Sequence, residues 1–91
     1  MINAKVLSVD GYEGWDVQEV HDIQVEKWDS ESVKKAIVEK MFSEEYVTPI
    51  TKADITEVFS GYQTSKKKGV MSFMGDENGY HIIKLSEQPT Q

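Results

Sequence analysis

Residues 9–29 read VDGYEGWDVQEVHDIQVEKWD, with an acidic side chain at every third position from Asp10 to Asp22. A helix would spread these acids around its circumference, because three residues fall short of one turn. Apolar and polar residues alternate through much of the stretch, which is typical of a half-buried antiparallel strand. We therefore predict a strand over 15–26. Its apolar side consists of Trp15, Val17, Ile23 and Val25.

The alternation breaks at 19–21, where Glu19 and His21 fall on the apolar side. A bulge or a short interruption at this point would restore the register. Asp10 belongs to the turn DGYEG at 10–14, whose glycines favour a hairpin. The period of three is therefore not a site by itself, although the outward side of the strand is acidic.

Residues 29–45, DSESVKKAIVEKMFSEE, are predicted to form the main helix. Asp29 or Ser30 is the expected N-cap, since either side chain accepts a hydrogen bond from the first free amides. Glu31 and Lys35 have the spacing of a helical ion pair. The apolar side of this helix consists of Val33, Ala36, Ile37 and Met41.

The remaining strands are predicted from shorter apolar runs. INAKVLSV at 2–9 is apolar on both faces, which favours a central place in a sheet. VMSFM at 70–74 and YHIIKL at 80–85 are predicted strands, joined by the hairpin signal GDENG at 75–79. TSKKKG at 64–69 is predicted to be a loop.

The segment TKADITEVFSGY at 51–62 fits two structures. Thr51 and Asp54 have the spacing of a capping box, which marks the start of a helix. Its β-branched and aromatic residues instead favour a strand. We predict a strand over 55–62 and keep a second helix as the alternative.

The expected architecture is α+β, an antiparallel sheet of four to five strands with one main helix packed on one face. One domain is expected over 1–86, followed by a flexible C-terminal tail at 87–91. Because the strands at 70–74 and 80–85 are apolar on both sides, the face away from the helix is predicted to carry uncovered aromatic and methionine side chains. Such a surface is typical of an interaction site.

The chain of 91 residues has a formal net charge of −6, and all ten of its basic residues are lysines. This balance disfavours direct binding to nucleic acids or to anionic membranes, since affinity for phosphate depends on lysine and arginine. The absence of cysteine excludes disulfides and thiolate zinc sites. The sequence has no signal-peptide pattern and no apolar run of membrane-spanning length, so we expect a cytoplasmic protein.

No arrangement of residues in the sequence predicts an enzyme, a cofactor or a metal site. His21 and His81 lack a partner at metal-ligand spacing. Asp16 and Asp22 would lie about 20 Å apart along a strand, too far for paired acid–base chemistry. DENG at 76–79 lacks the remaining ligands of a calcium-binding loop.

The segments GWDV at 14–17, SEEY at 43–46 and GYHII at 79–83 resemble those of small uncharacterised proteins encoded by bacteriophages and prophages. Those proteins place a Gly-Trp strand after the first strand, then a helix, then a late Gly-Tyr strand. The resemblance spans most of the chain. It implies a small accessory protein that acts by binding, such as an inhibitor of a host enzyme or defence system, and it transfers no catalytic residues.

The leading hypothesis is an acidic protein-binding module, an inhibitor from a phage or mobile element that binds a host nucleic-acid-handling or defence protein with a basic surface. The expected partner-binding residues are Trp15, Asp16, Asp22, Glu26, Met71, Phe73, Tyr80 and Ile82. One alternative is a homodimer that buries the uncovered sheet face against a second copy. Another is a single-strand nucleic-acid binder that stacks bases on Trp15, Phe73 and Tyr80 beside the lysines at 66–68.

Overall fold

The computed structural model describes residues 1–46 and 49–87. It has an α+β fold in which five strands form one antiparallel sheet in the order β2-β1-β5-β4-β3. The elements are β1 (Ile2–Asp10), the short 3-10 helix η1 (Gly11–Glu13), β2 (Asp16–Val25), α1 (Ser30–Met41), α2 (Lys52–Val58), β3 (Gln63–Lys67), β4 (Val70–Met74) and β5 (Asn78–Glu87). Of the tail expected at 87–91, residue 87 ends β5 and 88–91 lie outside the described residues.

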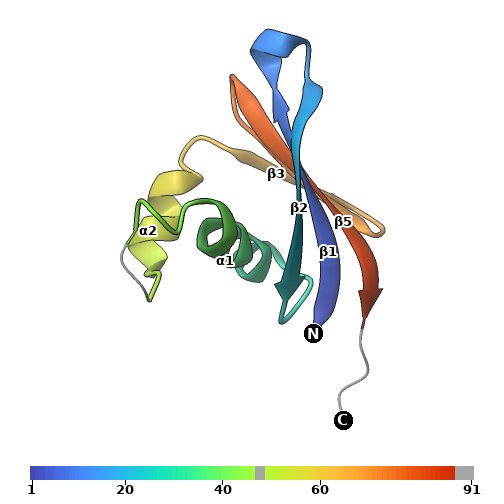
Figure 1. Cartoon of the computed structure of the whole chain (residues 1–91), viewed down its shortest axis with the longest axis vertical. Helices are drawn as coiled ribbons and strands as arrows, with labels where there is room; N and C mark the ends of the chain where they lie inside the picture. Colours follow the sequence, from blue (N-terminus) through green and yellow to red (C-terminus); the bar gives the residue numbers. More distant parts are fainter. Residues whose placement is uncertain (47–48, 88–91) are drawn as a thin grey trace.

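Both helices lie on the same side of the sheet, and the β1–β2 hairpin projects beyond them (Figure 1). The hydrophobic core forms between this side of the sheet and the helices. Its buried side chains include Val33, Ile37 and Val38 from α1, Ile50 and Phe59 flanking α2, and Ala4, Val6, Ile23, Val25, Met71, Phe73, Tyr80 and Ile82 from the sheet.

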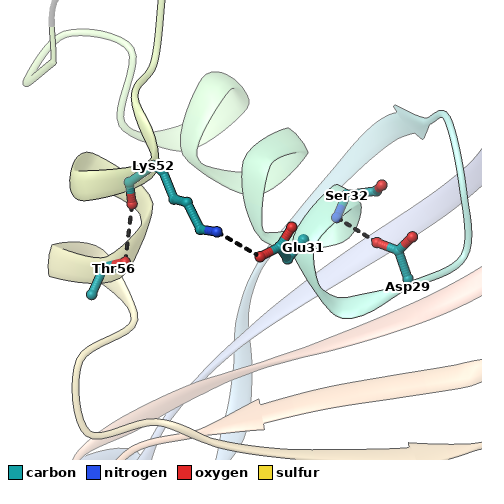
Figure 2. Close-up of polar contacts among 5 residues, drawn as sticks. All are labelled: Asp29, Glu31, Ser32, Lys52 and Thr56. Carbon is teal, nitrogen blue, oxygen red and sulfur yellow. Dashed lines mark hydrogen bonds and ion pairs between the residues drawn. The ribbon is translucent and has the colours of Figure 1, made fainter.

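The main helix begins as expected, with Asp29 as its N-cap. The Asp29 carboxylate accepts a hydrogen bond of 2.7 Å from the Ser32 amide (Figure 2). This bond stabilises the charged carboxylate and lowers the pKa of Asp29 below its usual value. Hydrogen bonding at the first turn and burial of one apolar side together explain why this segment is helical.

The strand predicted over 55–62 is wrong, because α2 occupies Lys52–Val58. The Asp54 amide donates to the Thr51 hydroxyl at 3.2 Å, and the Thr51 amide donates to the Asp54 carboxylate at 2.9 Å. The helical spacing of Ile55 and Phe59 lets both side chains pack against the core. This capping box and the burial outweigh the strand propensity of the segment.

The loop predicted at 64–69 is also wrong, since β3 covers Gln63–Lys67 and only 68–69 form the turn into β4. β3 is an edge strand, and all five of its side chains are exposed. Backbone pairing with β4 holds it in place. Such a strand has no apolar alternation, so the sequence carried no signal for it.

The irregularity in β2 lies next to the predicted position. Ser8 pairs with Glu19 and Val9 pairs with Val17, so Gln18 is the extra residue of a bulge. The bulge changes which side chains face the helices. Val17 therefore points away from the helices, unlike Ile23 and Val25 of the same strand, which are buried beneath them.

Replacing Phe73 by alanine is predicted to destabilise the protein by about 3–5 kcal/mol, because Phe73 is 0% exposed and truncation leaves a cavity. The matched surface change, Val20→Thr, is predicted to cost less than about 0.5 kcal/mol, since this side chain is solvent-exposed. Urea unfolding of both variants measures the difference. Equal losses of stability would contradict the burial of Phe73 and the exposure of Val20.

Candidate binding surface

The sheet face opposite the helices carries a group of apolar side chains, here called the open-face patch. Residues that pair across an antiparallel sheet share a face. Leu7 pairs with Val20, Val9 with Val17, and Ile83 with Val70, which places all six on this side. The open-face patch consists of Leu7, Val9, Val17, Val20, Val70, Met74, Ile83 and Leu85. Leu85 is the extra residue at a register shift of β5, and it is counted here because it lines a shallow hollow with Asn3 and Asp22, which lie on this face.

Three members of the patch are more than half exposed, with fractions of 51% for Val17, 52% for Val20 and 54% for Leu85. Val9 is buried although it belongs to this face, and the other members are partly exposed. Isolated exposed aliphatic residues are common on protein surfaces, whereas a contiguous group on one sheet face marks an interaction surface.

Polar groups within and beside the patch are paired with one another. The Lys5 ammonium lies 3.0 Å from the Asp22 carboxylate. Ser72 Oγ and His81 Nδ1 lie 2.8 Å apart near the centre of the face. Each of these groups has a hydrogen-bonding or ionic partner within the chain, which lowers the cost of covering them with a partner surface.

The hairpin tip next to the patch exposes two aromatic side chains. Tyr12 is 77% exposed and Trp15 is 44% exposed. The Tyr12 hydroxyl donates to the Glu77 carboxylate at 2.6 Å, and the Trp15 amide donates to the Asp10 carbonyl at 2.8 Å. The Tyr12 bond and nearby acidic charge raise the pKa of the phenol.

Trp15 has a backbone φ of 65°, directly after Gly14 with a φ of 74°. A left-handed conformation is ordinary for glycine but strained for a bulky residue. Strain of this kind persists where surrounding hydrogen bonds impose it, and it is found preferentially at functional sites. Trp15 is therefore the best-supported single residue of the candidate surface.

The expected site residues divide into two groups. Trp15, Asp16, Asp22 and Glu26 are exposed on β2 or beside its ends. Met71, Phe73, Tyr80 and Ile82 are instead in the core, with exposed fractions of 0%, 0%, 7% and 0%. The prediction that these four lie on the uncovered face is wrong, because they point toward the helices and their strand neighbours point away.

This reversal leaves the nucleic-acid alternative with one of its three expected stacking platforms. Phe73 and Tyr80 are buried and offer no face for a base to stack on. Lys66, one of the lysines at 66–68, donates from its ammonium to the Trp28 carbonyl at 3.0 Å. Only Trp15 of the three expected platforms is exposed to a substantial degree.

Within residues 1–46 and 49–87, no group of three or more histidine, aspartate or glutamate side chains is arranged to hold a metal ion. The Nε2 atom of His21 lies 3.0 Å from the carboxylate of Glu19, two residues earlier in the chain. No helix among these residues is long and apolar enough to cross a membrane.

The chain matches no protein-family model, no curated protein and no solved structure.

Burial raises the pKa of Tyr80 to about 12, and Tyr62, Glu19 and Glu45 act in the same direction. The native state therefore keeps this proton after the unfolded chain has lost it near pH 10. Below about pH 10 the contribution to stability is complete, and we predict that it falls by about 2 kcal/mol as the pH rises to about 11.5.

Urea unfolding at several pH values tests this assignment when wild type is compared with Tyr80→Phe. Lysines and the other tyrosines titrate in both proteins, so the difference between the two curves isolates Tyr80. The difference should be constant below about pH 10 and should change only above it. Parallel curves across the whole range would contradict the burial of this phenol.

Proposed function

We propose that the protein is a small acidic protein-binding module that engages its partner through the open-face patch and the adjoining hairpin tip. The observation that carries the proposal is the exposure of Val17, Val20 and Leu85 on a sheet face that neither helix covers. Interfaces gain most of their affinity from a few apolar or aromatic anchors surrounded by polar groups. Trp15 beside this patch supplies such an anchor.

The charge distribution supports a partner with a basic surface. The chain has a net charge of −6, and Asp16, Asp22 and Glu26 are exposed on β2 or just beyond it. Complementary charge accelerates encounter and selects the orientation of binding. Because many basic protein surfaces handle nucleic acid, this charge agrees with the role implied by the resemblance to phage accessory proteins, inhibition of a host nucleic-acid-handling or defence protein.

The first test is capture of partners from a bacterial lysate by the tagged protein at low salt, followed by mass spectrometry. Any recovered protein is then purified and its affinity measured. Val20→Asp is predicted to weaken binding at least about tenfold, because it places a charge in the apolar contact. Ala53→Asp adds the same charge on the exposed side of α2 and should change affinity less than about twofold.

Two results would contradict the proposal. One is the absence of any specific partner at low salt, and the other is equal weakening by Val20→Asp and Ala53→Asp. Light scattering of the purified protein addresses the homodimer. A tight dimer that Val20→Asp dissociates would show that a second copy, rather than a host protein, covers the patch.

A further prediction concerns the strained tip. Trp15→Gly removes the aromatic anchor. It also removes the strain of the left-handed backbone conformation, which costs about 1–3 kcal/mol when a residue other than glycine adopts it. We expect the variant to bind its partner at least about tenfold more weakly while remaining folded. Calorimetric unfolding and a binding titration measure the two properties separately. Unchanged affinity would exclude Trp15 from the interface.

A further inference from the structure

A hollow of about 470 Å³ is lined by residues of both helices and of the segments beside α2. Both helices lie on one side of the sheet (Figure 1), so the hollow is on the side away from the open-face patch. Its apolar lining comes from Ile50, Ile55 and Phe59. Ile50 and Phe59 are buried, so they form the floor of the groove. The volume lies within the range of pockets that bind small organic molecules.

The rim of this groove is positively charged in a chain that is otherwise acidic. Lys34, Lys35 and Lys52 line it, and among the described lining residues Glu31 is the only acidic one. Figure 2 shows Lys52 and Glu31 pointing toward one another from the two helices. Their charged atoms are 3.6 Å apart, and the two side chains are 83% and 79% exposed. An ion pair this exposed is weak and separates readily.

The expected helical pair of Glu31 with Lys35 does not form, because Glu31 pairs with Lys52 instead. Within the described parts of the chain, no ion pair joins Lys34 or Lys35 to a carboxylate. The Lys34 ammonium lies 5.7 Å from the centre of the Phe59 ring. This contact places a positive charge directly beside the apolar floor.

We propose that the groove binds a small amphipathic carboxylate, with its aliphatic chain on Ile50, Ile55 and Phe59 and its carboxylate between the lysine ammoniums. An apolar floor beside a cationic rim matches a ligand with one anionic end and one hydrocarbon end. Each ammonium–carboxylate contact is a charge-assisted hydrogen bond, which is stronger than a neutral one. This site is separate from the surface of the proposed function, and each can fail without the other.

The test is a titration of the isotope-labelled full chain with decanoate, followed by two-dimensional NMR. We expect saturable shifts at Ile50, Ile55 and Phe59, and much weaker binding of decanol and of decyltrimethylammonium, which share the chain but lack the anion. Lys34→Met and Lys52→Met should each weaken decanoate binding about three- to fivefold. Lys67→Met, which removes an exposed charge on β3, should leave binding within about twofold.

Dispersed spectra establish that each variant is folded before it is titrated. Lys34→Met also removes the contact with the Phe59 ring. If this loss disturbs the fold, Lys52→Met still tests the positive charge at the rim, because Lys52 is exposed. The proposal would be overturned by shifts that do not saturate, by equal binding of decanoate and decanol, by lysine variants that bind like wild type, or by shifts centred on Val20 and Leu85.

Discussion

Both helices of this protein bury their apolar sides against one face of a five-stranded sheet, and this one-sided packing determines what the rest of the surface presents. Val17, Val20 and Leu85 on the other face remain exposed. Both helices lie on the opposite side of the sheet and do not cover them (Figure 1). Burying those side chains against a partner would recover about 25 cal/mol for each Å² of apolar area removed from water. The exposed face is therefore a source of binding free energy that the isolated chain leaves unused.

An aromatic cluster joins the second helix to the sheet. The ring of Phe59, just after α2, lies 5.3 Å from Phe73, 6.0 Å from Tyr80 and 5.5 Å from Tyr62, each in an edge-to-face arrangement. Edge-to-face pairs of this kind add to the free energy of burial. The same Phe59 ring forms part of the groove floor, so one packing contact positions α2 and shapes the hollow between the helices.

Much of the fold was predictable from local patterns in the sequence. The β4–β5 hairpin, the central strand β1, the helix α1 and its Asp29 cap were all predicted, because each depends on residues close together in the chain. The edge strand β3 was not, since backbone pairing with β4 holds it while its side chains stay in solvent. The second helix was only an alternative, because local capping competed with strand propensity and tertiary packing decided the outcome.

The candidate site was predictable only in part, for a specific physical reason. β4 and β5 are apolar on both sides, so alternation identifies two sets of side chains without showing which set the helices cover. The expected set contained Phe73 and Tyr80, the larger residues, and these are the ones in the core. Trp15 is exposed, which agrees with its expected place on a binding surface, but its left-handed backbone leaves no signal in the sequence.

The most direct test of the one-sided packing is the solvent accessibility of methyl groups in the isolated protein. Relaxation of the methyl signals by a soluble paramagnetic agent should be measured at a concentration where light scattering finds a monomer. The account predicts strong relaxation for Val17, Val20 and Leu85 and little for Val33 and Ile82. Equal protection of both groups in the monomer would contradict it, because the second face of the sheet would then already be covered.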